Sequence, residues 1–190
     1  SSFSAIEPLC IEHTKLNLLH IGRIADAKGQ EDAIKACEIL VENNIDFELN
    51  IVGGFDLAYK SKFVQFYENC EYKDNINLVG FTNDTLSYIQ KSDIFIFPSY
   101  GEGLSNSFLE AMSNNIVCIA YSNTSFPELQ DLGLYFRITK DRNIDELKDT
   151  LLDISKNLVI EKRNSSINYN LIKKLFSEKL EMNKYKEILV

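Results

Sequence analysis

Two carboxylates, Glu102 and Glu110, mark the segment of this chain that is best equipped for chemistry, with seven residues between them. Glu102 follows the apolar run Ile94–Phe97 and a proline, a pattern typical of a buried strand that ends in a loop. Glu110 lies in the helical pattern that comes next. We therefore expect one carboxylate beyond the carboxyl end of a strand and the other inside the following helix, where open α/β sheets bind their ligands.

The backbone between these carboxylates is suited to an anion. Four backbone amides are expected to point out of the first turn of the helix: Gly103, Leu104, Ser105 and Asn106. Ser105 is a suitable N-cap, and the helix dipole adds to the amides in holding a phosphate. Glu110 can accept hydrogen bonds from a ribose diol, and Glu102 can accept them from a sugar hydroxyl. The segment therefore favours a phosphorylated sugar as ligand.

A pair of cations follows the first expected strand, Leu16–Ile21. Arg23 and Lys28 lie in a loop flanked by Gly22 and Gly29, and glycine lets a backbone approach a ligand closely. A guanidinium fork and a mobile ammonium can together neutralise a diphosphate. Two solvated surface cations are the alternative, and the loop alone does not decide between the two interpretations.

Two further glycine-containing loops follow expected strands. Gly53 and Gly54 come after the second strand, where a tight turn is favoured over ligand contact, because the dinucleotide fingerprint needs three glycines after the first strand. Phe81 follows Gly80 after the third strand. Phe81 can stack on a nucleotide base, although a position in the core or at its rim is the simpler interpretation.

These loops belong to a regular alternation of strands and helices. The expected strands are Leu16–Ile21, Phe47–Val52, Ile76–Val79, Ile94–Phe97, Ile116–Ala120 and Leu134–Ile138. The expected helices are Gln30–Glu42, Asp56–Tyr72, Asn83–Lys91, Ser105–Asn114, Asn143–Asn157 and Asn168–Leu189, with a helical turn at Pro127-Glu128. The alternation predicts an α/β fold, a Rossmann-like doubly wound parallel sheet of about six strands with helices on both faces. Residues 1–15 are predicted to be an N-terminal tether or linker remnant, and residues 16–190 a single domain.

Composition argues against several classes of protein. The 28 acidic and 20 basic residues give a net charge of −8, which disfavours a nucleic-acid binder. No stretch approaches the ~20 apolar residues of a membrane span, and no signal peptide is recognised. Four widely spaced cysteines lie in or near apolar patterns: Cys10, Cys37, Cys70 and Cys118. They indicate reduced buried thiols, and His13 and His20 have no partner at metal-ligand spacing, so no metal is expected.

In their order and spacing, the motifs resemble the C-terminal domain of GT-B glycosyltransferases of family four, the group 1 class. The resemblance runs from about Lys15 to Val190. The motifs that carry it are Gly22-Arg23…Lys28-Gly29, Ile51-Val52-Gly53-Gly54, Val79-Gly80-Phe81, Ser92-Asp93-Ile94-Phe95-Ile96-Phe97-Pro98-Ser99, Leu109-Glu110-Ala111-Met112, Pro127-Glu128 and Phe176-Ser177…Tyr185. The chain departs from the family at Asn114-Asn115-Ile116, where Gly-x-Pro is usual, and at Asn123–Phe126, where glycines are usual.

The resemblance implies the half of a GT-B enzyme that binds a nucleoside-diphosphate sugar, of the UDP or GDP type. By position, Arg23 and Lys28 would bind the diphosphate and stabilise it as it leaves. Glu102 would contact the donor sugar, and Glu110 would bind the ribose. The remaining donor-site residues would be Gly22, Phe81, Gly103, Leu104, Ser105 and Asn106. The enzyme would be a retaining, metal-independent hexosyl- or related glycosyltransferase without a cofactor, acting in glycan, lipopolysaccharide or capsule-type polysaccharide synthesis.

The resemblance also implies that this chain would need a second domain for activity. A full enzyme of this type has an N-terminal acceptor-binding domain, so we expect the isolated domain to be inactive and its acceptor to be a glycan or lipid-linked glycan. Neither nucleic acid nor a transmembrane segment is expected, and the location would be cytoplasmic, either free or peripheral at the inner face of the membrane. Two alternatives stay open: a non-catalytic sugar-nucleotide-binding subunit that pairs with a separate acceptor domain, and a sugar-nucleotide epimerase of GT-B architecture.

Overall fold

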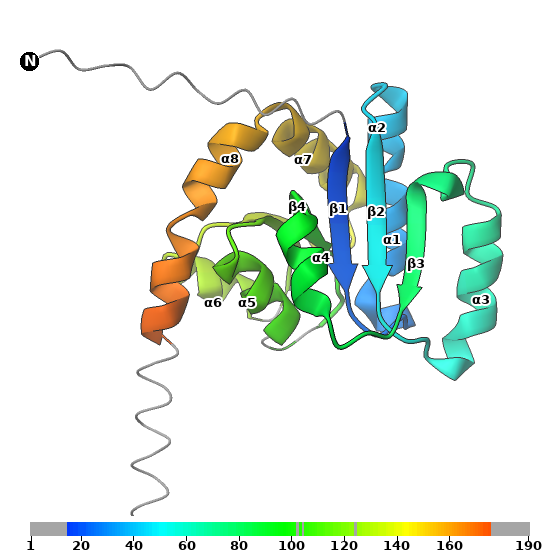
Figure 1. The fold of residues 1–190 in the computed structure, drawn as a ribbon, viewed down its shortest axis with the longest axis horizontal. Helices are drawn as coiled ribbons and strands as arrows, with labels where there is room; N and C mark the ends of the chain where they lie inside the picture. The colour runs from blue at the N-terminus through cyan, green and yellow to red at the C-terminus, as the bar shows by residue number, and fades with distance from the viewer. Residues whose placement is uncertain (1–14, 102, 104, 124, 176–190) are drawn as a thin grey trace, which may run out of the picture.

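A single parallel sheet organises the chain. The computed structural model describes residues 15–101, 103, 105–123 and 125–175. Six strands form the sheet in the order β3-β2-β1-β4-β5-β6. Figure 1 labels β1, β2, β3 and β4. The strands are β1 (Leu16–Ile21), β2 (Phe47–Val52), β3 (Ile76–Gly80), β4 (Ile94–Phe97), β5 (Val117–Ser122) and β6 (Arg137–Lys140). All neighbouring strands pair in parallel, which confirms the predicted sheet.

Helices connect the strands and cover both faces of the sheet (Figure 1). The helices are α1 (Gln30–Ala36), α2 (Glu38–Glu42), α3 (Leu57–Glu68), α4 (Thr85–Lys91), α5 (Asn106–Ser113), α6 (Phe126–Asp131), α7 (Ile144–Lys156) and α8 (Leu158–Ser165). Residues 168–175 are helical as well. The rest of the predicted final helix lies outside the described residues, as does the predicted N-terminal tether up to residue 14. None of the helices in the described part of the chain is long and apolar enough to cross a membrane.

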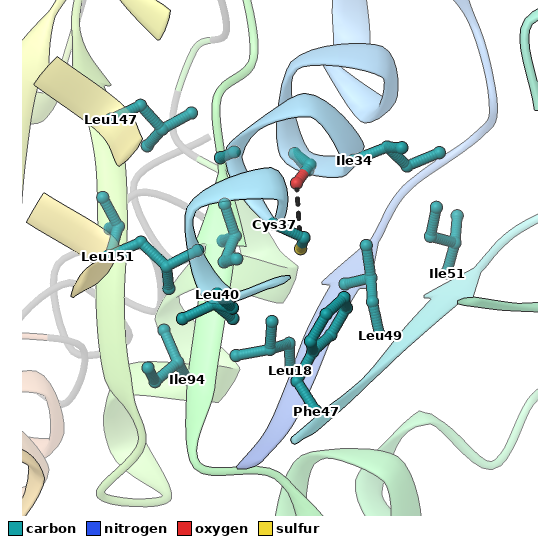
Figure 2. Close-up of a cluster of buried hydrophobic side chains, with 14 of the residues drawn as sticks. Leu18, Ile34, Cys37, Leu40, Phe47, Leu49, Ile51, Ile94, Leu147 and Leu151 are labelled. Carbon is teal, nitrogen blue, oxygen red and sulfur yellow. Dashed lines mark hydrogen bonds between the residues drawn. The ribbon is translucent and has the colours of Figure 1, made fainter. Parts of the chain in front are cut away.

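The side chains of β4 show why the strand sequences are continuously apolar. Ile94 and Ile96 belong to the core cluster that includes side chains of α1, α2 and α7, part of which is drawn in Figure 2. Phe95 and Phe97 belong to the opposite cluster, with side chains of α5 and α6. Successive side chains of a strand point to opposite faces, and both faces of this sheet are buried. An apolar residue is therefore favoured at every position of β4.

The prediction of one helix over Gln30–Glu42 is wrong in one respect, because the structure has two helices, α1 and α2, with a break at Cys37. The amide of Cys37 donates to the carbonyl of Ile34 at 3.0 Å, and the amide of Leu40 donates to the carbonyl of Cys37 at 3.0 Å. These bonds span three residues and not four, so the helix tightens locally into a turn. The thiol of Cys37 also donates to the carbonyl of Ala33 at 3.3 Å, the dashed line in Figure 2.

The last strand was predicted too early, over Leu134–Ile138, whereas β6 begins at Arg137. Leu134 and Phe136 are buried, but the backbone between them does not pair with β5. The side chain of Asn168 forms hydrogen bonds with that backbone instead. Its amide donates to the carbonyl of Tyr135 at 2.7 Å, and its oxygen accepts from the amide of Tyr135 at 2.7 Å. A buried asparagine therefore satisfies the groups that a neighbouring strand would have satisfied.

Asp93, which is 3% exposed, lies at the amino edge of the sheet, directly before β4. One carboxylate oxygen lies 2.6 Å from the ammonium of Lys162 on α8, and the other accepts from the amide of Asn17 at 3.0 Å. This pair joins α8 to the start of β1. Among the described cysteines, Cys37 and Cys118 are buried free thiols as predicted, and Cys70 is a half-buried one.

Candidate functional site

The loops that follow β1, β4 and β5 meet at the carboxyl edge of the sheet, beside the place where the strand order reverses between β1 and β4. The amide of Tyr100 donates to the carbonyl of Ala27 at 2.8 Å, and the hydroxyl of Ser99 donates to the same oxygen at 3.0 Å. The side-chain amide of Asn123 donates to the carbonyl of Ser99 at 2.8 Å. The loop that carries the predicted cations is therefore in direct contact with the segment that leads to the predicted carboxylates.

Two glycines make this close approach feasible. Gly29 has φ +71, and a methyl carbon on it would lie 1.9 Å from the carbonyl oxygen of Pro98 at the end of β4. Gly53 has φ +152, and a methyl carbon on it would lie 2.0 Å from the carbonyl oxygen of Gly22. Both glycines serve backbone packing between neighbouring loops, which in turn sets the positions of Arg23 and Lys28.

Arg23 and Lys28 lie on the same short loop but in different surroundings. The side chain of Arg23 is 67% exposed, and its guanidinium lies 3.5 Å from the carboxylate of Asp56, the N-cap residue of α3. Lys28 ends the 3₁₀ turn η1 (Asp26–Lys28) and is half-buried. Its carbonyl accepts from Nε2 of the fully buried His20 at 2.9 Å. The His20 ring therefore fixes the backbone of the loop while Arg23 reaches into solvent.

Gln30 is a site residue that sequence reasoning missed. Its side chain is 1% exposed, and its amide nitrogen donates to the carbonyl of Arg23 at 2.9 Å. This bond holds the backbone of Arg23 against the start of α1. No local pattern marks Gln30, because a glutamine at the first position of a helix is usually a solvated residue.

A cavity of about 410 Å³ opens beside this loop, at the carboxyl ends of β1, β2 and β3. Its lining includes three predicted site residues: Gly22, Arg23 and Phe81. Gly54, Thr82 and Thr85 also line it and were not predicted as site residues. Phe81 is 78% exposed, so it stands at the rim and not in the core. An exposed aromatic ring beside a cavity with glycine walls is suited to stacking on a flat ligand.

Helix α5 presents its first turn to the same edge. Ser105 is its N-cap as predicted, since its hydroxyl accepts from the amide of Phe108 at 3.4 Å. The hydroxyl of Ser107 donates to the carbonyl of Ile21 at 3.2 Å, which fixes this turn to the end of β1. Asn106 and Glu110 are both exposed, and their spacing puts them on one face of α5.

Aromatic packing sets the rotation of α5. The ring of Phe108 lies 4.9 Å from the ring of Phe126 and 5.2 Å from the ring of Phe136, both in edge-to-face geometry. Gly103 is exposed at the approach to the helix. The predicted site residues Glu102 and Leu104 lie outside the described residues. Within the described part of the chain, no three His, Cys, Asp or Glu side chains are grouped as metal ligands.

The chain is similar to proteins of one known family. The family description "Glycosyl transferases group 1" matches residues 4–172. The chain belongs to the group 1 glycosyltransferases. It is 28% identical over 153 residues to the capsular polysaccharide biosynthesis glycosyltransferase CapH of Staphylococcus aureus, covering 80% of this chain and 42% of CapH. It is 28% identical over 152 residues to the amylovoran biosynthesis glycosyltransferase AmsK of Erwinia amylovora, covering 76% of this chain and 37% of AmsK. The chain therefore spans less than half the length of these curated relatives.

Solved structures share the fold of this group 1 chain. TarM superposes with a TM-score of 0.78 at 21% identity, over 92% of this chain and 35% of TarM. The C-terminal domain of the group 1 protein LpcC from Francisella tularensis gives 0.73 at 18% identity, over 85% of this chain and 86% of that domain. Anabaena HepE in complex with UDP gives 0.70 at 18% identity, over 89% of this chain and 49% of HepE. The predicted GT-B domain fold is confirmed.

Proposed function

We propose that this chain is the donor-binding domain of a retaining, metal-independent glycosyltransferase that uses a nucleoside-diphosphate sugar. The observation that carries the proposal is the meeting of two separately predicted segments at one edge of the sheet: the loop with Arg23 and Lys28, and the first turn of α5. Membership of the group 1 glycosyltransferases supports it. So does the fold shared with HepE, whose structure was determined with UDP.

Each part of the donor has a matching surface. The base would enter the cavity beside Phe81 and stack on its ring. The ribose would face Glu110, whose exposed carboxylate can accept two hydrogen bonds from a diol. The diphosphate would lie between the loop of Arg23 and Lys28 and the N-terminus of α5, where cations and the helix dipole favour an anion.

The same groups would promote transfer of the sugar. As the bond from the sugar to the diphosphate breaks, negative charge grows on the departing phosphate, and a preorganised positive site stabilises that charge. Arg23, Lys28 and the dipole of α5 would supply this positive potential, which is why we propose metal independence. Glu102 would contact the donor sugar. No cofactor besides the nucleotide sugar is proposed.

The acceptor side would belong to a further domain. The chain covers 42% of CapH and 37% of AmsK, and a domain isolated from LpcC matches it over most of its length. We propose that residues 1–15 are a linker to an N-terminal acceptor-binding domain, and that the isolated donor domain transfers no sugar. The names of CapH and AmsK favour capsule-type or other polysaccharide synthesis, with a glycan or lipid-linked acceptor at the inner face of the membrane.

Calorimetric titration of the folded chain with UDP, GDP and ADP, and with their sugars, tests the proposal. One of the three bases is expected to bind, and ligand at about a hundred times its dissociation constant should stabilise the fold by ~2.7 kcal/mol. Arg23→Ala and Glu110→Ala should each weaken binding roughly tenfold, as the loss of a hydrogen bond to a charged group does. Arg163→Ala and Glu42→Ala, which remove exposed charges from α8 and α2, are the matched controls. Absence of binding to every ligand at millimolar concentration would rule the proposal out.

A further inference from the structure

A buried carboxylate lies behind the candidate site and takes no part in the contacts proposed for the donor. Asp32, in the first turn of α1, is 5% exposed. Two phenol hydroxyls donate to the same oxygen of its carboxylate: that of Tyr100, and that of Tyr121 at 2.9 Å. Burial raises the pKa of both phenols, and Asp32 raises them further, so both remain protonated donors at neutral pH.

Tyr100 is the residue through which this cluster meets the candidate site. Its ring stacks on that of Tyr121 with centroids 6.0 Å apart, and the guanidinium of Arg142 lies 4.4 Å from the ring centroid. Its backbone amide donates to Ala27, the residue before Lys28. Gly101, the next residue, has φ +68. Side chain and backbone of Tyr100 are thus both fixed at the end of the described segment that follows β4.

We propose that Asp32 is a positioning residue of the donor site, which acts through Tyr100 to hold the chain after β4 against the loop of Lys28. The inference rests on the proposed function, since it concerns how that site binds the sugar diphosphate. A buried carboxylate is costly unless it is hydrogen-bonded, and here the bonds join α1 to the turn after β4. Tyr121 lies on β5 and reaches that turn only through its stacking on the ring of Tyr100. Since Tyr121→Phe keeps this ring, we expect loss of its hydroxyl to change stability and not donor binding.

The two hydrogen bonds from tyrosine to Asp32 allow a matched set of variants. Asp32→Asn removes the negative charge from the group that accepts both phenol hydroxyls. Tyr100→Phe removes one hydroxyl and keeps the ring, and Tyr121→Phe removes the other hydroxyl from the same carboxylate. The readout is the ratio of two dissociation constants, for a nucleoside diphosphate and for its sugar ester. UDP with UDP-glucose and GDP with GDP-mannose are the probes, and the melting temperature is recorded for each variant.

Asp32→Asn and Tyr100→Phe are expected to weaken binding of the sugar ester roughly tenfold more than binding of the diphosphate. Tyr121→Phe should lower the melting temperature and leave the ratio unchanged. In the Tyr100→Phe background, Asp32→Asn should change the ratio no further. A ratio that is unchanged in Asp32→Asn, or that changes equally in Tyr121→Phe, would overturn the inference and leave the proposed function standing. Failure of the unsubstituted chain to bind the four probes, and ADP with its sugar as well, would overturn both.

Discussion

Replacing Gly29 with alanine is expected to be one of the most damaging single-methyl additions in this chain. The residue has φ +71, a region in which alanine is about 1–2 kcal/mol less stable than in the right-handed region. The new methyl carbon would lie 1.9 Å from the carbonyl oxygen of Pro98, whereas real Cβ atoms essentially never come within 3.0 Å of such an atom. Neither partner is a flexible side chain, so the loop after β1 must move away from the end of β4. Overpacking of this kind adds about 1–3 kcal/mol.

The two costs together lower the free energy of unfolding by about 2–5 kcal/mol, and the melting temperature of a chain of this size by roughly 4–20 °C. Urea unfolding followed by circular dichroism measures the loss. Gly80→Ala is the matched control, because Gly80 has φ +81 but no atom within 4 Å of the added carbon. It should show only the backbone cost of about 1–2 kcal/mol. Equal losses in the two variants would refute the claim that the β1 loop is packed against Pro98.

Two further predictions concern buried polar groups. Asp93→Ala should lower the free energy of unfolding by about 3 kcal/mol, because it removes the carboxylate that holds Lys162 and the start of β1. Asp74→Ala, which removes an exposed carboxylate, should stay within about 0.5 kcal/mol, and a similar small effect for Asp93→Ala would contradict the account. Burial is the first cause of a raised pKa at five of the described phenols: Tyr59, Tyr72, Tyr100, Tyr121 and Tyr135. Because their pKa values are higher in the folded state, the stability they contribute is complete below about pH 10, the unfolded value, and is lost as the pH rises above it. Urea titrations at pH 8 and pH 10.5 should show this loss, and equal stability at both would count against it.

The parts of the fold that follow from local pattern were predictable. The strand Ile94–Phe97 is an uninterrupted apolar run because both of its faces are covered, and its bounds were predicted as the structure has them. Ser105 was predicted as an N-cap because its residue type and the following helical pattern are both local signals. The break at Cys37 was not predictable, since no glycine or proline marks it.

The contacts that shape the candidate site lie beyond local pattern. Asn168 forms hydrogen bonds with the backbone of Tyr135, 33 residues earlier in the chain, and β6 begins only after that residue, at Arg137. Tyr100 and Asp32 are 68 residues apart. The sequence places such residues on an element, but only the packed sheet decides which of them meet. For that reason the loops at the carboxyl edge were predictable, whereas the contacts of Gln30 and Asp32 were not.

Cavity size alone does not select the donor site. A cavity of about 420 Å³ also lies at the amino edge of the sheet, lined by Leu16, Ile45 and Leu158 among others. Only the carboxyl edge combines Arg23 and Lys28 with the N-terminus of α5. Positive charge and the reversal of strand order between β1 and β4 therefore distinguish the carboxyl edge from the amino edge.

Amide chemical shifts of the ¹⁵N-labelled chain, recorded as UDP or GDP is added, test the central claim most directly. The account predicts that the largest changes occur at the carboxyl edge, at the amides of Gly22, Gly54, Phe81 and Asn106. The amides around Leu16, Ile45 and Leu158 should stay unchanged. Changes concentrated at those amino-edge amides, or no changes with either nucleotide at millimolar concentration, would contradict the assignment of this edge as a nucleotide-sugar site.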